Sequence, residues 1–153
     1  MLPVTHILCP IDFSESSYKA LETAEELAVH FNAKLTVLHV VQDIPVLPAL
    51  PTNPSIDVPE YQEKLEEAGR IALETTIQEK ISSIVQVESA IKSGRPADVI
   101  IDVADEIKPD FLVISTHGES GVTHLFFGSV AEKVIRHASC PVLTVQTDGT
   151  EIP

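Results

Sequence analysis

The feature that most constrains this chain is a repeated alternation between short apolar runs and longer segments in which apolar residues have helical spacing. The apolar runs are rich in β-branched residues, which favours strands that are buried on both faces of a sheet. In the segments between them, apolar residues recur every three or four positions, which is typical of helices packed on a sheet. We expect strands at residues 6–11, 34–41, 85–91, 111–114 and 141–145, and helices at residues 15–31, 60–82, 96–107 and 129–137.

This alternation predicts an α/β fold, in which a five-stranded parallel sheet of Rossmann-like topology carries helices on both faces. Ligands of such sheets bind outside the carboxyl ends of the strands, where the strand order reverses. Candidate site residues are therefore expected after the first, second and fourth strands. The length of 153 residues suits one domain that covers residues 1–153.

One segment between the second strand and the second helix has a different composition. Residues 43–59 contain Pro45, Pro48, Pro51, Pro54 and Pro59. Because proline lacks a backbone donor and disfavours helix, we expect an extended loop on the surface. Two interpretations of this loop stay open, a partly disordered connection without a role, and a lid or partner contact.

The charge balance limits the classes of partner. Ten Lys and Arg residues stand against 23 Asp and Glu, which gives a formal net charge of −13 at pH 7. A surface so acidic repels phosphate backbones and anionic lipid headgroups, so nucleic acid and membranes are not expected as partners. A nucleotide remains compatible with this charge, because salt screens exposed charges over about 8 Å and backbone N–H groups can form a local anion site.

The cysteines and the amino-terminal residues bear on the compartment. Cys9 and Cys140 lie in or beside apolar runs and form no CxxC pair, so we expect reduced core thiols. The first six residues contain no basic segment and no long apolar segment, and no stretch reaches the ~18 apolar residues of a membrane span. These features predict a cytoplasmic protein.

Residues 115–129, between the fourth strand and the fourth helix, have the composition of a phosphate-binding loop. Glycines let the backbone approach a phosphate closely, and the N–H groups at the start of a helix favour an anion. The hydroxyl of Ser129 could donate to a phosphate or cap the helix. An ordinary connecting loop is the alternative. The chain has neither a Walker A Gly-Lys-Ser/Thr nor a GxGxxG after its first strand, which disfavours those two classes.

Asp12 is the other notable position, because it follows the first strand directly. Its carboxylate could accept from a ribose hydroxyl or help to hold a Mg²⁺ carried by phosphates. Alternatively, it is an acidic residue beside Ser14, which we expect to cap the first helix. His117 and His124 are seven residues apart, which is no zinc spacing, and no Gly-x-Ser-x-Gly is present. Neither a metal cage nor a catalytic residue is therefore expected.

Three stretches of the sequence carry a resemblance that covers essentially the whole chain. They are residues 6–14 (HILCPIDFS), residues 38–40 (LHV), and the run from Gly118 through residues 128–134 (GSVAEKV) to residues 140–143 (CPVL). The chain resembles the universal stress protein (UspA-like) family, in its nucleotide-binding branch. Nucleotide-binding members carry Gly, two residues, Gly, nine residues, and then Gly-Ser or Gly-Thr. Gly118 and Gly128-Ser129 match this pattern, whereas Ser115 replaces its first glycine.

The resemblance implies an adenine nucleotide alpha hydrolase-like fold that binds ATP or AMP, with Mg²⁺ as a candidate companion of the phosphates. It further implies a regulatory module of the stress response that forms a homodimer through its last strand and acts on an unidentified protein partner. Two alternatives stay open, a nucleotide-independent interaction module, favoured by Ser115, and a weak ATP-hydrolysing enzyme, disfavoured by the lack of an obvious general base and arginine clamp. The site residues implied are Pro10, Ile11, Asp12, Val40, Ile114, Ser115, Gly118, Gly128, Ser129, Val130 and Ala131.

Overall fold

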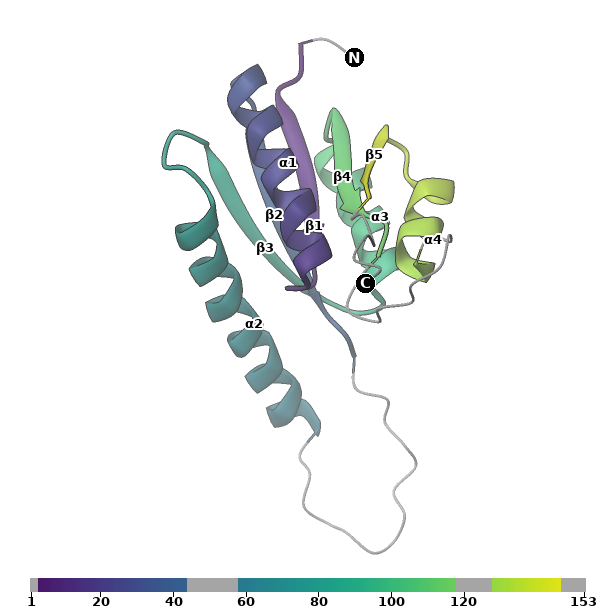
Figure 1. Cartoon of the computed structure of the whole chain (residues 1–153). Coiled ribbons are helices and arrows are strands. Elements are labelled where there is room, and N and C mark those ends of the chain that lie inside the picture. Colours follow the sequence, from purple (N-terminus) through teal and green to yellow (C-terminus); the bar gives the residue numbers. More distant parts are fainter. Residues whose placement is uncertain (1–2, 44–57, 118–127, 147–153) are drawn as a thin grey trace, which may run out of the picture.

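The computed structural model describes residues 3–43, 58–117 and 128–146. Five parallel strands form one sheet in the order β3-β2-β1-β4-β5, with helices packed against it (Figure 1). The expected α/β fold is therefore confirmed. The strands are β1 (His6–Ile11), β2 (Lys34–Val41), β3 (Val87–Ser93), β4 (Phe111–Ser115) and β5 (Val142–Val145), and the helices are α1 (Glu15–Phe31), α2 (Val58–Lys80), α3 (Pro96–Ile107) and α4 (Ser129–His137).

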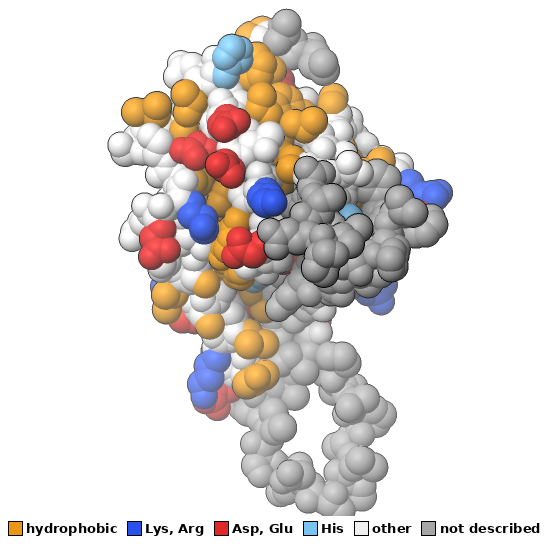
Figure 2. All heavy atoms as spheres, viewed as in Figure 1, with side chains coloured by type: hydrophobic (Ala, Val, Ile, Leu, Met, Phe, Trp, Pro, Cys, Tyr) orange, Lys and Arg blue, Asp and Glu red, His pale blue; other side chains and the backbone are white. Residues whose placement is uncertain are grey.

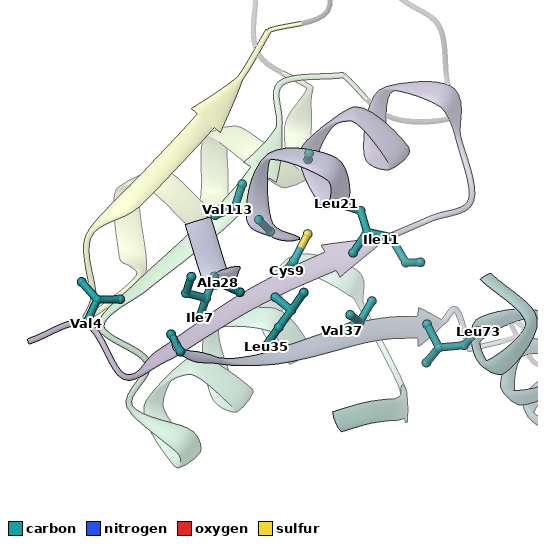
Figure 3. Packing of buried hydrophobic residues seen from close by; sticks show 13 residues of the cluster. Val4, Ile7, Cys9, Ile11, Leu21, Ala28, Leu35, Val37, Leu73 and Val113 are labelled. Carbon is teal, nitrogen blue, oxygen red and sulfur yellow. The ribbon is translucent and has the colours of Figure 1, made fainter. Parts of the chain in front are cut away.

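Two hydrophobic clusters lie on opposite faces of this sheet, because alternate residues of each strand point to opposite sides. On β1, Ile7 and Cys9 belong to one cluster, and Leu8 between them belongs to the other. The first cluster is covered by α1 and α2 and is shown in Figure 3. The second is covered by α3 and α4. Burial on both faces explains why β1, β2 and β4 read as nearly continuous apolar runs.

Local signals set several of the element boundaries. The hydroxyl of Ser14 accepts a hydrogen bond from the backbone N–H of Ser17, which confirms Ser14 as the N-cap of α1. Before α3, Gly94 has a φ of 140°, and a Cβ at this position would lie 2.8 Å from Val99 Cγ2. Only glycine fits there, and Pro96 then begins the helix.

Several boundaries differ by one or two residues from those expected from the sequence, most of them in α2 and β3. Helix α2 begins at Val58, inside the predicted proline-rich loop, because Pro59 in the first turn gives up an N–H that needs no helical partner. The helix ends at Lys80, and β3 begins two residues later than expected, at Val87 opposite Leu35 of β2. The intervening backbone turns, with the N–H of Val85 donating to the carbonyl of Ser82.

The remaining part of the proline-rich segment, residues 44–57, lies outside the described residues, so its two interpretations stay as predicted.

On the molecular face drawn in Figure 2, acidic and basic side chains both lie among apolar ones. On α2, for example, Arg70 pairs with Glu67 at 2.6 Å and with Glu74 at 2.7 Å. Within the part of the chain that the structure describes, no helix is long and apolar enough to cross a membrane.

Candidate functional site at the carboxyl edge of the sheet

A cavity of about 970 Å³ opens at the carboxyl edge of the sheet. Its walls come from the ends of β1, β2 and β4, from the start of α4 and from one side of α2. The strand order reverses between β1 and β4. Strands β2 and β3 lie on one side of β1, whereas β4 and β5 lie on its other side. The cavity therefore occupies the place where open parallel sheets bind their ligands.

The structure brings together nearly all of the site residues predicted from the sequence. They come from three strand ends and one helix start that are far apart in the chain. Gly118 lies outside the described residues. The residues that line the cavity are Pro10, Ile11, Asp12, Val40, Ile114, Ser115, Gly128, Ser129, Val130 and Ala131.

One side of the cavity is apolar. Val40 and Ile114 belong to the cluster beneath α3 and α4, together with Ile100 of α3, which also lines the cavity. Pro10 lies between Val40 and Ile114 in sheet order, since β1 is flanked by β2 and β4. These side chains offer a floor without charges, which suits a flat, largely apolar group.

Asp12 lies both at the cavity and at the start of α1. It lines the cavity, and its Oδ1 accepts hydrogen bonds from the backbone N–H of Ser14, at 3.1 Å, and from the Ser14 hydroxyl. Between them, Phe13 has a φ of 64°, in the left-handed region. The Asp12 carboxylate is therefore held at the cavity by the turn that begins α1.

Sequence reasoning missed the contribution of α2 and of His39. Leu65, Ala68, Gly69 and Ala72 of α2 line the cavity. A Cβ on Gly69 would lie 3.2 Å from the His39 ring, so the glycine lets the helix approach β2 closely. A glycine in mid-helix, directly after Ala68 and three residues before Ala72, was the available signal, since it indicates close packing of the backbone against a neighbour.

Ser115 fits its position without backbone strain. Among the described residues, the non-glycine residues with positive φ are Phe13, Asn32 and Lys108, so Ser115 is not one of them. Its hydroxyl donates to the carbonyl of His117 at 2.8 Å. The departure from the family glycine therefore costs no strain and adds a hydrogen bond that closes the first turn after β4.

The start of α4 faces the cavity. Gly128 is its N-cap, has a φ of −59°, and provides no side-chain cap. Ser129 is thus the first helical residue, and the interpretation of its hydroxyl as the cap is wrong, because Gly128 occupies the cap position. The N–H of Gly128 donates to the carbonyl of Thr116 at 2.7 Å, which fixes the helix start beside the end of β4. The positive end of the α4 dipole therefore points at the cavity.

The thiols lie away from this site and are not suited to chemistry. Complete burial raises the pKa of the Cys9 thiol far above its usual range, and partial burial also raises the pKa of the Cys140 thiol. Both cysteines are free. In the described ranges, no group of three or more His, Cys, Asp and Glu side chains is arranged to hold a metal ion.

The family model described as "Universal stress protein family" matches residues 3–146 of this chain. The chain belongs to the universal stress protein family. Among the relatives of this universal stress protein, MJ0531 from Methanocaldococcus jannaschii is 34% identical over 145 residues, which cover 95% of this chain and 84% of the relative.

Solved structures of the family share the fold. The universal stress protein UspA from Lactobacillus plantarum has a TM-score of 0.79 at 26% identity, covering 93% of this chain and 97% of its own. A universal stress protein family protein from Arabidopsis thaliana, solved with AMP bound, has a TM-score of 0.63 at 28% identity, covering 97% of this chain and 96% of its own.

Proposed function

We propose that this universal stress protein binds an adenine nucleotide, foremost ATP, in the carboxyl-edge cavity. The proposal extends to one domain over residues 1–153, which acts in the cytoplasm as a homodimeric regulatory module of the stress response. The observation that carries it is the convergence on one cavity of ten residues that the sequence had singled out for this ligand. The relative from Arabidopsis thaliana with AMP bound supports the class of ligand.

The cavity offers separate surfaces to the parts of a nucleotide. The uncharged floor of Pro10, Val40 and Ile114 suits the adenine ring. The Asp12 carboxylate, at the end of β1, can accept from a ribose hydroxyl, as an acidic residue does in other doubly wound sheets. The N–H groups of Ser129, Val130 and Ala131 at the start of α4 suit the phosphates.

Gly128 leaves room for those phosphates. Among the described residues, the atom nearest to a Cβ at this position would be the carbonyl oxygen of Thr116, at 3.4 Å, which is ordinary contact. Because φ is negative, neither the conformation of Gly128 nor its described neighbours require glycine here. A glycine at this helix start is consistent with phosphates that approach the backbone closely.

Two features favour binding over turnover. No Lys or Arg occurs among the described residues that line the cavity, so nothing there resembles the cationic clamp of phosphoryl-transfer enzymes. Among the described residues that line the cavity, Asp12 is also the only one with a carboxylate, and its Oδ1 already accepts hydrogen bonds from Ser14. Such a site fits a Mg²⁺ that arrives with the phosphates better than a cation held by the protein, and it supports at most weak ATP hydrolysis.

The nucleotide proposal is tested by mass spectrometry of the gently purified protein, followed by calorimetric titration with ATP, AMP and adenosine, with and without EDTA. We expect ATP or AMP to copurify and ATP to bind at one site per chain, more tightly with Mg²⁺. If none of the three ligands binds, the alternative of a nucleotide-independent interaction module is correct. Equal ATP affinity with EDTA removes Mg²⁺ from the proposal.

The two edges of the sheet differ in a way that supports dimerisation through β5. The opposite edge strand, β3, carries the charged residues Glu88 and Lys92, which discourage pairing with another edge. Strand β5 (VLTV) carries no charge, and Leu143 is 41% exposed. A twofold axis would pair two such strands antiparallel.

The dimer is tested by sedimentation of the variant Leu143→Lys at micromolar concentration. The exposed Leu143 is the better target than Val142, which packs against the cluster beneath α3 and α4. We expect Leu143→Lys to weaken dimerisation. The control is Ser89→Lys, at an exposed position on β3, which should leave the dimer intact. A monomeric wild type, or a Leu143→Lys dimer of unchanged affinity, would show that β5 is not the interface.

A further inference from the structure

Histidines are the only side chains of the described cavity lining that can carry positive charge. The ionisable groups that line it there are Asp12, His39 and His117, with no Lys or Arg. Lys133 and Arg136 of the neighbouring α4 are paired with Asp98 at 2.5 Å and with Glu132 at 2.9 Å, and they do not line the cavity. Among these ionisable side chains, only His39 and His117 can therefore donate a hydrogen bond to bound phosphates.

His117 lies at the phosphate end of the proposed site. It follows Thr116, whose carbonyl accepts from the N–H of Gly128 at the start of α4. Its ring nitrogen Nδ1 is 2.9 Å from the hydroxyl of Thr116, which is only 2% exposed. The opposite nitrogen, Nε2, is on the far side of the ring from Thr116.

The Thr116 hydroxyl determines which nitrogen of a neutral His117 carries the proton. Leaving a buried hydroxyl donor without an acceptor costs about 1–3 kcal/mol, and Nδ1 of His117 is the partner that the structure gives it. The hydroxyl therefore donates to Nδ1, so that the ring proton is on Nε2. His117 thus presents a hydrogen-bond donor even when it is uncharged.

His39 has the opposite arrangement. Its Nδ1 lies 2.9 Å from the carbonyl oxygen of Ile11, which can only accept, so the neutral ring carries its proton on Nδ1. Its Nε2 is then an acceptor, and the ring packs against Phe13 with centroids 4.3 Å apart. A neutral His39 is thus unsuited to an anion, and the two cavity histidines have different chemistry.

We propose that the neutral His117 ring, held in this tautomer by the Thr116 hydroxyl, donates a hydrogen bond from Nε2 to the phosphates of the bound nucleotide. This inference rests on the proposed nucleotide binding. Hydrogen bonds to an ionised group are about twice as strong as neutral ones, so the bond from Nε2 to a phosphate oxygen should contribute measurably to ATP affinity.

The test is calorimetric titration of ATP and of adenosine with the wild type and His117→Phe, which keeps a ring but removes both nitrogens. We expect ATP affinity to fall about tenfold in His117→Phe, because a hydrogen bond to a charged phosphate oxygen is lost. Adenosine, which has no phosphate, should bind both proteins equally.

Three further variants separate a direct role from a structural one. Thr116→Val removes the hydroxyl that sets the tautomer and should lose part of the ATP affinity but none of the adenosine affinity, whereas Thr116→Ser should retain both. His137→Gln, at the exposed end of α4, should behave as the wild type. These variants keep the inference testable if His117→Phe fails to fold.

The outcomes are distinct. If ATP binds and His117→Phe keeps the full ATP affinity, His117 does not contact the phosphates, although the proposed function stands. If adenosine affinity falls as much as ATP affinity, the ring acts on the base or ribose instead, and the inference is wrong. If ATP fails to bind to the wild type, the proposed function is wrong and this inference falls with it.

Discussion

The two ends of the sheet both carry a hollow, but they present opposite electrostatic environments. The carboxyl-end cavity faces the amino terminus of α4 and has Asp12 as its one described carboxylate. The amino-end hollow, of about 660 Å³, lies where α3 and α4 end and includes the two carboxylates Asp105 and Asp110 beside one cation, Lys108. Helix amino termini attract anions and carboxyl termini repel them.

The polar groups at the two ends also differ in what they bind. At the amino end they satisfy one another, since Asp110 accepts from the N–H of Thr5 at 2.6 Å and from that of His6 at 2.9 Å. The His6 ring bonds the Thr36 hydroxyl at 2.8 Å. At the carboxyl end, the start of α4 has no side-chain cap. We therefore attribute the polar groups of the amino end to the stability of the fold, and we propose the carboxyl end as the ligand site.

The largest effect should come from reversing the charge at the ligand end with Gly128→Asp. We expect ATP affinity to fall by about 100-fold or more, because the new carboxylate meets the phosphates and caps the N–H groups that would bind them. Stability should be preserved, since Asp is a favourable N-cap and a Cβ at Gly128 makes only ordinary contact with the described residues. Calorimetry with ATP and urea unfolding measure both quantities.

Gly128→Asn is the matched control for Gly128→Asp, because it adds a cap of the same size without the charge. It should lose less affinity than the aspartate. Placing an acidic residue at the other end of the same helix, with His137→Asp, should leave ATP binding unchanged. Equal ATP affinity in the wild type and Gly128→Asp would contradict the assignment of the phosphates to this helix start.

A smaller effect, on stability alone, should follow from a change at the fold end. Asp110→Ala removes the acceptor of the Thr5 and His6 N–H groups and should cost about 1–2 kcal/mol in the free energy of unfolding. ATP affinity should not change. Loss of ATP binding without loss of stability would break the distinction between the two ends.

The pH dependence of Asp110 has a definite sign. Hydrogen bonds from the Thr5 and His6 backbone hold the pKa of the Asp110 carboxyl below its usual range. Its contribution to stability is therefore present above the ordinary Asp pKa, about 4, and is lost as the pH falls through the lower folded value. In urea unfolding, the difference between wild type and Asp110→Asn should shrink below about pH 4.

The smallest effect is expected for Ser115→Gly, which restores the family residue. Since Ser115 is unstrained and its hydroxyl bonds the carbonyl of His117, ATP affinity should be kept within about threefold or tighten slightly. Titration of this variant beside the wild type provides the measurement. A loss of more than tenfold would mean that the serine hydroxyl itself contacts the nucleotide.

The sequence predicted the parts of this molecule that local chemistry determines. Strands β1 and β2 and helix α4 were placed with their observed bounds, because apolar runs end at clear turn and cap residues. The start of β3 was missed by two residues, since its register is set by pairing with β2 and no local residue marks it. The α2 wall of the cavity was missed for a related reason, because contact between a helix and a distant strand end is not encoded in local spacing.

The most direct measurement is a crystal structure of the protein grown with ATP and Mg²⁺. The account predicts adenine against Pro10, Val40 and Ile114, the ribose beside Asp12, and the phosphates at the start of α4. A nucleotide bound elsewhere, for example in the amino-end hollow, or a carboxyl-end cavity that stays empty at saturating ATP, would contradict it.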